Sequence, residues 1–459
     1  MKRFILFLLI ITTIFSSLFA QKDFEKYKDN DLLRYASISF LVKELGTNKV
    51  VAEYQSHYPL RPASTLKLIT TITALEVLGK DFRFPTTLEY NGKITKQGVL
   101  KGNLYIRGSY DPTLGSKKMG DIKFLDKWLE SVKKAGIKRI SGKIIALLSP
   151  KDKQLINPKW IWEDIGNYYA PTIQAISYKD NTYRLTLRSK SVGTTPKIIS
   201  ITPKLNQLKF ENNVVSAKIG YDSAYIYGSP YSNKRKIFGK IPANRKRFTV
   251  KGDIPNPALL LVKDFAWKLK SNNIRVGGVG VSMKLKRKMS VIYTHYSPTI
   301  KEIITETNVK SNNHYAEHLY HYLNRKEEHF IYNYWKKRGM SVSELFQYDG
   351  SGLSPFDAVS ANFLVEILQN IQFSDNYKSF QQSLAISGKK GTLKHFLDKS
   401  SLSGKIYGKS GSLEQTKSYA GYCYNNGKEY VFAIIINNAN GKNGKVKKEI
   451  EHILTDILQ

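Results

Sequence analysis

Ser64 and Lys67 are the first residues of this chain whose types and spacing could do chemistry. They lie three residues apart in RPASTLKLIT (61–70), where the apolar pattern predicts a buried helix. Residues three apart share one helix face, so the Lys67 amine could reach the Ser64 hydroxyl. A serine hydroxyl needs a base to take its proton, and a lysine between Leu66 and Leu68 can be that base because burial lowers its pKa.

The same pair also has a purely structural interpretation. Ser64 could cap the helix, while Lys67 extends its ammonium to water. Ser-x-x-Lys also occurs at Ser131–Lys134 and Ser387–Lys390, so this spacing does not decide the matter by itself.

A second group of candidates lies in GKSGSL (408–413), at the end of an expected strand. Lys409 with the Ser410 hydroxyl would hold a carboxylate, and Gly411 would allow a close approach of backbone. The main-chain amide of Ser412 could then point at an oxyanion. The alternative is an ordinary strand end that contains glycine.

A third group lies in SNNHYAEHL (311–319), where a loop leads into a helix. Ser311 and Asn313 are the polar side chains of interest. Both residue types are also common helix N-caps, so this group is informative only together with the other two.

The order Ser-x-x-Lys, Ser-x-Asn, Lys-Ser-Gly resembles the three motifs of penicillin-binding proteins and serine β-lactamases. Four longer stretches are more specific: GNLYIRGSYDPTL (102–114), WIWEDIGNYYAP (160–171), YDGSGLS (348–354) and ISGKKGTL (386–393). They resemble signature stretches of the class C low-molecular-mass penicillin-binding proteins, the D-alanyl-D-alanine carboxypeptidase/endopeptidase family. The resemblance covers nearly all of the mature chain.

The resemblance implies a serine DD-peptidase that cleaves D-alanyl-D-alanine bonds, and D-alanyl-diaminopimelate bonds if it acts as an endopeptidase. Its substrates would be peptidoglycan stem peptides, cleaved through an acyl-enzyme that penicillin also forms. Ser64 would be the nucleophile and Lys67 the base, and Ser311 would relay a proton to the leaving D-alanine. A second ammonium, that of Lys409, would also help to push Lys67 toward its neutral form.

The remaining site residues would bind substrate. Asn313 would orient the substrate amide, Lys409 and Ser410 would hold the terminal carboxylate, and the amides of Ser64 and Ser412 would stabilise the oxyanion. The resemblance implies no metal and no organic cofactor. β-Lactam antibiotics are the expected covalent inhibitors, and the oligomeric state stays open.

Two details of the motifs depart from the family pattern. Ser410 stands where the family usually has threonine, but the hydroxyl is kept. SDN (374–376) also fits Ser-x-Asn; we prefer Ser311 and Asn313 because ETNVKSNNHYAEHL (306–319) resembles the family's context around its second motif.

Three other functions remain as alternatives. A serine β-lactamase would share the Ser64 chemistry but would deacylate fast. A zinc peptidase is considered because His314 to His318 spell H-x-x-E-H, with His321 nearby. A non-enzymatic, polyanion-binding envelope protein would be indifferent to loss of Ser64.

The composition indicates a folded, exported protein. The chain has 459 residues, 41% of them hydrophobic, and one cysteine, Cys423, so it must fold without intramolecular disulfides. Residues 1–20 have the layout of a signal peptide, which predicts a periplasmic location. The formal net charge of +35 predicts attraction to polyanions, such as anionic lipid or cell wall; because the protein is expected to be exported, no nucleic-acid partner is expected.

The expected fold is α+β and multidomain, an antiparallel sheet flanked by helices as in penicillin-binding proteins and serine β-lactamases. Residues 21–82 and 290–459 are expected to form one discontinuous peptidase domain. Within it, a helix is expected at 22–33, followed by a β-hairpin, and strands with a final helix near the C-terminus. Residues 83–289 are expected to be a β-rich insertion of two modules.

Overall fold

The computed structural model describes residues 24–284 and 289–459, which form two compact units. The first unit combines the chain up to Phe82 with Ile300–Gln459, and the second is Arg83–Thr299. The expected signal peptide, 1–20, lies outside the described residues. In the described part of the chain, no helix has the length and apolar character needed to cross a bilayer.

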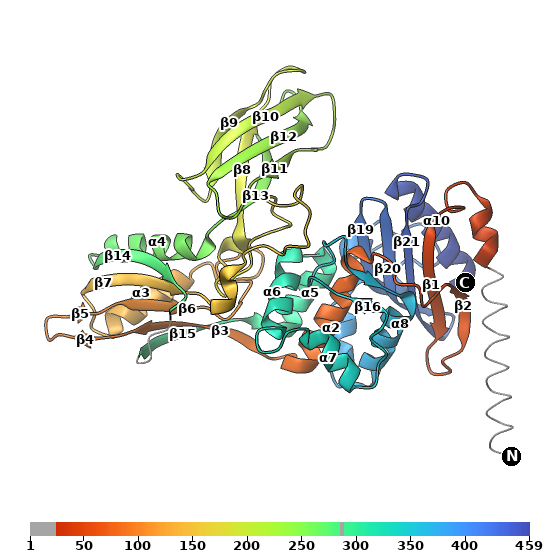
Figure 1. Ribbon diagram of the computed structural model, residues 1–459, viewed down its shortest axis with the longest axis horizontal. Coiled ribbons are helices and arrows are strands. Elements are labelled where there is room, and N and C mark those ends of the chain that lie inside the picture. The colour runs from red at the N-terminus through yellow and green to blue at the C-terminus, as the bar shows by residue number, and fades with distance from the viewer. Residues whose placement is uncertain (1–23, 285–288) are drawn as a thin grey trace, which may run out of the picture. The chain divides into compact units, whose positions relative to one another are not determined.

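The first unit is built on a six-stranded antiparallel sheet (Figure 1). The N-terminal hairpin and the C-terminal strands complete one sheet, as the sequence predicts. The strands, in their order across the sheet, are β18 (Ala385–Ile386), β19 (Ile406–Leu413), β20 (Thr416–Asn425), β21 (Lys428–Asn437), β1 (Ser37–Glu44) and β2 (Val50–Tyr54).

The strands of this sheet carry apolar side chains on both faces, and helices cover them. Ile434 and Ile436 join Ile450 and Leu454 of α10 in one core cluster. α8 packs against β1 and β21, and its end accepts a hydrogen bond from the Tyr422 hydroxyl through the Leu368 carbonyl at 2.7 Å. The α-helices of this unit are α2 (Lys67–Leu78), α5 (Ile300–Lys310), α6 (Asn313–Leu323), α7 (Phe330–Lys337), α8 (Ala361–Asn370), α9 (Tyr377–Gln382) and α10 (Asn443–Leu458).

α2 carries the Ser-x-x-Lys segment and packs against α5, α6 and α8. Nine of its residues, from Lys67 to Leu75, are buried, and it ends at Gly79, which has a φ of 82°. The prediction of a mostly buried helix here is confirmed. The helix expected at 22–33 is too long: residues 22–23 lie outside the described residues, 24–25 are α-helical, the 3-10 helix η1 (Lys26–Asp29) follows, and residues 30–35 form a bend and turns.

The second unit contains a seven-stranded sheet with two helices, α3 (Phe124–Lys134) and α4 (Pro257–Lys270), that strand-like patterning did not reveal. Both helices contribute buried apolar residues to one core cluster with this sheet. The strands of the sheet are β3 (Arg83–Tyr90), β4 (Lys93–Ile94), β5 (Val99–Lys101), β6 (Leu104–Arg107), β7 (Arg139–Leu147), β14 (Arg275–Ser282) and β15 (Ser290–Thr299).

The remaining strands form two three-stranded sheets that also contribute to that core. One has the order β13 (Phe248–Asp253), β8 (Thr182–Arg188), β9 (Lys197–Thr202); the other has β10 (Lys209–Ala217), β12 (Lys234–Pro242), β11 (Tyr225–Tyr227). We propose that this pair of sheets and the seven-stranded sheet are the two expected modules.

The boundary expected at residue 290 differs from the structure. Residues 290–299 are strand β15, which pairs antiparallel with β3 inside the second unit. The chain therefore returns to the first unit at Ile300, where α5 begins.

Candidate active site

Ser64 lies in the 3-10 helix η2 (Ala63–Leu66), directly before α2. Ala63 has a φ of 48°, in the left-handed region that residues with a side chain rarely adopt. Gly352 approaches this turn so closely that a Cβ on it would lie 1.9 Å from the Ala63 carbonyl oxygen. Packing against the glycine-containing loop therefore fixes the turn that presents the partly exposed Ser64.

Lys67 is the first residue of α2, and its side chain is fully buried. Its Nζ donates to Ser64 Oγ at 2.8 Å, to Asn313 Oδ1 at 2.8 Å and to the Ser351 carbonyl at 2.6 Å. The amide and carbonyl oxygens can only accept, whereas the Ser64 hydroxyl can also donate. A neutral amine keeps two N–H groups, so it can retain those two bonds and accept the Ser64 proton on its lone pair.

The electrostatic surroundings of Lys67 act in two directions. Burial lowers the pKa of Lys67 to about 8, while the carboxylates of Asp349, Glu317 and Asp357 act to raise it. A pKa one unit above neutral pH leaves roughly a tenth of the lysine uncharged at pH 7. Part of the Lys67 population is therefore neutral at pH 7 and can act as a base.

Asp349 organises the loop that supplies the Ser351 carbonyl. Its buried carboxylate accepts four main-chain N–H groups, from Ser351, Gly352, Leu353 and Ser354. These four hydrogen bonds fix the main chain of residues 351–354. The loop is therefore folded around the Asp349 side chain.

Two further buried carboxyl groups surround this loop. Glu317 on α6 accepts the Gly350 amide at 3.1 Å, and Asp357 accepts the Tyr348 amide at 2.7 Å. Burial raises the pKa of both carboxyls well above its usual value, and the charge of Asp349 raises it further. Both groups therefore favour the protonated form more than an exposed carboxyl does, and of the three acids Asp349 has the largest effect on Lys67.

Ser311 and Lys409 form a second pair. Ser311 lies between α5 and α6 with a φ of 56°, and its Oγ accepts from Lys409 Nζ at 2.9 Å. Lys409 is fully buried on β19, and Nζ also donates to the Ser410 carbonyl at 2.6 Å. Burial lowers the pKa of Lys409 well below its usual value, and the charge of Lys67 lowers it further. The charge of Lys67 thus acts on Lys409, whereas the groups that act on Lys67 are the three carboxylates, so the expected effect of Lys409 on Lys67 is not found, and burial lowers the pKa of Lys67 instead.

Gly411 brings β19 against the Ser64 turn. A Cβ on Gly411 would lie 2.2 Å from Ser418 Oγ, 2.5 Å from the Pro62 carbonyl oxygen and 3.0 Å from the Ser64 amide nitrogen. The backbone of β19 therefore passes directly beside that amide, and Ser412 is the next residue. This brings the main chain of Ser412 near that of Ser64, the two residues expected to supply an oxyanion hole.

The hydroxyl groups of the third motif have separate partners. Ser410 Oγ donates to Thr392 Oγ1 at 2.9 Å. Ser412 Oγ accepts from Asn443 Nδ2 at 3.1 Å, and the same Nδ2 donates to the Leu413 carbonyl at 2.8 Å. Asn443 thus fixes the end of β19, a role that the sequence analysis missed because a single asparagine after a loop carries no distinguishing signal.

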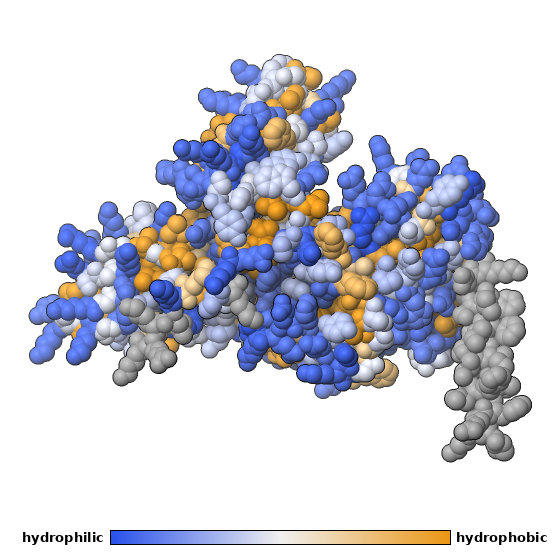
Figure 2. Space-filling model, viewed as in Figure 1, coloured by the Kyte–Doolittle hydropathy of each residue, from blue (hydrophilic) through white to orange (hydrophobic). Residues whose placement is uncertain are grey.

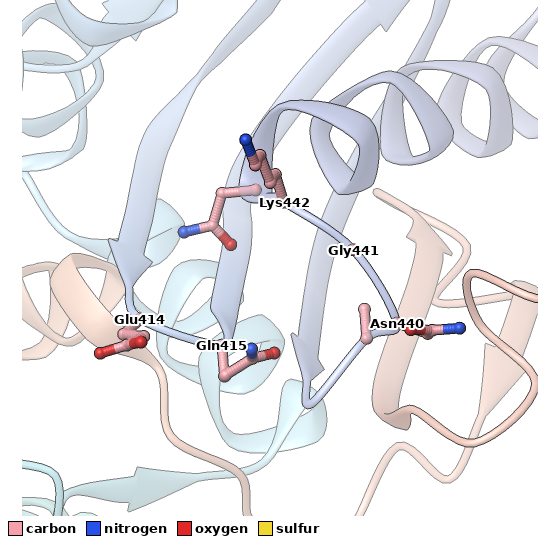
Figure 3. A pocket seen from close by; sticks show the side chains of 7 residues that line it. Glu414, Gln415, Asn440, Gly441 and Lys442 are labelled. Atoms are coloured by element: carbon pink, nitrogen blue, oxygen red, sulfur yellow. The ribbon is translucent and has the colours of Figure 1, made fainter.

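A pocket lies beyond this point, at the turn between β19 and β20 (Figure 3). The turn residues Glu414 and Gln415 form one side, and the loop before α10 forms the other, with Asn440, Gly441 and Lys442. No predicted site residue belongs to the lining of this pocket.

The competing Ser-x-Asn segment lies elsewhere in the unit. Ser374 Oγ and Asn376 Nδ2 both donate to Glu76 Oε1, at 2.6 and 3.0 Å. Glu76 is nine residues after Lys67 on α2, about 13 Å along the helix. Ser374 and Asn376 therefore cap a buried carboxylate, and it is Asn313 that contacts Lys67.

The H-x-x-E-H segment forms part of α6. Glu317 accepts the Gly350 amide, and His318 Nδ1 contacts the His314 carbonyl at 2.8 Å. Within the described ranges, no three or more His, Cys, Asp and Glu side chains are grouped so that they could hold a metal ion. The carboxylate of this segment belongs to the buried acidic cluster below Lys67.

The antiparallel sheet flanked by helices, with a buried lysine beside a serine at the start of α2, defines a serine hydrolase with the penicillin-binding protein and serine β-lactamase type of fold. Residues 20–458 match the model of the D-Ala-D-Ala carboxypeptidase 3 (S13) family, and the chain belongs to this family.

Individual relatives agree with this assignment. The D-alanyl-D-alanine carboxypeptidase DacB of Haemophilus influenzae is 23% identical over 88% of this chain and 85% of its own. The D-alanyl-D-alanine carboxypeptidase of Actinomadura sp. is 23% identical over 92% and 81%. The crystal structure of penicillin binding protein 4 (dacB) from Haemophilus influenzae matches with a TM-score of 0.80 and 23% identity, covering 95% of this chain and 98% of the other.

Proposed function

We propose that this serine hydrolase is an exported, penicillin-sensitive DD-peptidase in which peptidoglycan stem peptides acylate Ser64. The observation that carries the proposal is the buried Lys67, whose Nζ lies 2.8 Å from Ser64 Oγ and whose pKa is lowered to about 8. A serine with a neutral amine at this distance is an activated nucleophile.

The proposed reaction forms and breaks an acyl-enzyme. Ser64 Oγ attacks the carbonyl carbon between the last two D-alanines, and Lys67 takes the hydroxyl proton. The main-chain amides of Ser64 and Ser412 donate to the oxyanion. The C–N bond then breaks, a proton passes through Ser311 to the departing amine, and water hydrolyses the ester to restore Ser64.

The proposed substrate contacts lie along β19. β18 pairs with Tyr407 and Gly408, and no strand of the described residues pairs with the same edge beyond them. A stem peptide can therefore add to this edge as an extended strand. In this arrangement Asn313 orients the substrate amide, while the charge of Lys409 and the hydroxyl of Ser410 attract the terminal carboxylate.

The relatives support the choice of substrate and inhibitor. Two of them are D-alanyl-D-alanine carboxypeptidases, and the Haemophilus influenzae protein has also been solved in complex with a β-lactam, a structure that matches with a TM-score of 0.76 and 21% identity, covering 94% of this chain and 98% of the other. The signal-like sequence at 1–20 supports a periplasmic location. The proposed reaction requires neither a metal nor an organic cofactor.

The test is labelling of the mature protein with a fluorescent penicillin, with and without EDTA, beside Ser64→Ala. We expect a covalent label that requires Ser64 and is unaffected by EDTA, together with release of D-alanine from a pentapeptide. Cleavage of a cross-linked dimer of stem peptides would show endopeptidase activity as well. A folded wild-type protein that takes no label would overturn the acyl-enzyme.

A further inference from the structure

The sheet β10-β12-β11 of the second unit has one buried face and one exposed face. Side chains alternate between the two, as in any strand. Val214, Ile226 and Ile237 point into the core. The exposed face, which we call the lysine–aromatic face, carries a distinct set of residues: Lys209, Glu211, Asn213 and Val215 on β10, Lys234, Lys236, Phe238 and Lys240 on β12, and Tyr225 and Tyr227 on β11.

Three aromatic rings lie together in this face. The Phe238 and Tyr227 ring centroids are 5.7 Å apart with an edge-on orientation, and those of Tyr225 and Tyr227 are 6.5 Å apart. Phe238 remains 43% exposed and Tyr225 37%. Figure 2 shows apolar and hydrophilic atoms side by side on the part of the molecule that contains β10 and β12. Contiguous exposed rings of this kind are typical of an interaction surface.

Positive charge surrounds the rings. Four lysines and one acid project from the three strands. The acid, Glu211, forms an ion pair with Lys236, with 3.1 Å between Oε2 and Nζ. The segment 182–253 that contains both small sheets has fifteen Lys and Arg residues and three Asp and Glu residues. Of these, Arg235 and Asp253 are buried together as a pair. The exposed charge is therefore almost entirely positive, and the net charge per residue of this segment is about twice that of the whole chain.

We propose that the lysine–aromatic face binds peptidoglycan strands apart from the site of cleavage. The aromatic rings offer apolar contact to sugar rings, and the lysine ammoniums can pair with the carboxylates of stem peptides. Peptidoglycan carries both groups on one polymer, so its charge is complementary to that of the face. The proposal rests on the proposed function for its choice of polymer. A second attachment on the same chain raises the effective concentration of stem peptides at Ser64.

A bilayer is the main competing partner for aromatic and basic residues. Membrane binding requires apolar side chains to reach about 5–10 Å into the interface. Here the rings contact one another within the surface of a sheet, and each is more than half covered, so they form part of the sheet surface rather than protruding anchors. An extended glycan fits such a face better than a bilayer does.

The test measures binding to insoluble peptidoglycan by co-sedimentation. All proteins carry Ser64→Ala, so that binding is scored without acylation and stays independent of the proposed chemistry. One variant changes Lys234, Lys236 and Lys240 to Glu, and a second changes Tyr227 and Phe238 to Ser. The control changes Lys93, Lys96 and Lys101 to Glu, three exposed lysines of the same unit, and therefore alters net charge equally.

We expect at least fivefold weaker binding for both face variants and less than twofold change for the control. Removing the stem peptides from peptidoglycan should weaken its binding to the parent protein. The same removal should leave its binding to the triple-Glu variant unchanged. With Ser64 restored, the face variants should keep the penicillin acylation rate and lose activity only on insoluble substrate. Equal loss in the control, no loss in either variant, or a loss confined to anionic phospholipid vesicles would overturn the proposal.

Discussion

The ammonium of Lys67 and the main-chain carbonyl of Ser351 are joined by a hydrogen bond of 2.6 Å. Asp349 holds that carbonyl in place, because its carboxylate accepts the amides of residues 351–354. The same carboxylate raises the pKa of Lys67 against the effect of burial. Asp349 is thus a positioning residue that acts on the base through both geometry and charge.

Asp349→Asn should weaken both catalysis and the loop. An asparagine presents N–H groups toward amide donors, and each unsatisfied buried donor costs about 1–3 kcal/mol. A small displacement of the base lowers acylation by about 10²-fold. Removing the negative charge should also lower the pKa of Lys67, so that the pH profile of penicillin acylation moves to lower pH.

The control for this change is Asp375→Asn, at an exposed carboxylate of the same unit. It should leave the free energy of unfolding and the acylation rate within experimental error. If Asp349→Asn slowed acylation with no movement of the pH profile, the electrostatic role would be wrong and only the structural role would remain.

The sequence predicted those parts of the site and fold that short motifs or regular alternation mark, and missed those that depend on main-chain groups or long-range contacts. Ser64, Lys67 and Lys409 stand in short motifs with fixed spacing, and the N-terminal hairpin and C-terminal strands have clear alternation, so their places were predictable. The Ser351 carbonyl carries no residue-type signal. α3 and α4 were missed because they lie among short strands and turns, and residues 290–299 were assigned to the wrong unit because strand pairing with β3 is a long-range contact.

Acylation should depend on pH through Lys67. The reactive form is the neutral amine, whose fraction increases as pH rises through the pKa of about 8. We therefore expect the acylation rate by a fluorescent penicillin to rise roughly tenfold per unit below pH 7.5 and to level off above pH 9. A profile flat from pH 6 to 9 would contradict Lys67 as the base.

Lys67→Arg should slow acylation strongly while the fold persists. An arginine cannot lose its proton in a protein, so it keeps the charge and removes the base. General-base catalysis contributes about 10²–10⁴-fold, and the rate of penicillin labelling should fall by that amount. Because the larger guanidinium could disturb this buried position, Lys67→Met is measured beside it, with circular dichroism of both. Normal labelling by either folded variant would contradict the assignment.

Gly411→Ala should damage the oxyanion hole without removing any functional group. The added Cβ would lie 2.5 Å from the Pro62 carbonyl oxygen and 3.0 Å from the Ser64 amide nitrogen, so β19 must move away from the Ser64 turn. Loss of one oxyanion donor costs about 10²–10³-fold in rate. Gly444→Ala is the matched control, since a Cβ there meets nothing within 4 Å. Equal rates for the two variants would mean that β19 does not set the oxyanion geometry.

Ser410 tests which part of the third motif binds the carboxylate. Its Oγ donates to Thr392 Oγ1 at 2.9 Å, so the hydroxyl is already oriented at the edge of β19. Ser410→Thr keeps the hydroxyl and should change kcat/KM for a D-Ala-D-Ala peptide by less than threefold. Ser410→Ala removes one hydrogen bond to a charged group, worth about 1.5–3 kcal/mol, and should lower kcat/KM by about 10–100-fold. A substrate ending in an amide instead of a carboxylate should lose this difference between serine and alanine. If alanine is as active as serine on the free acid, the carboxylate is held by Lys409 without the hydroxyl.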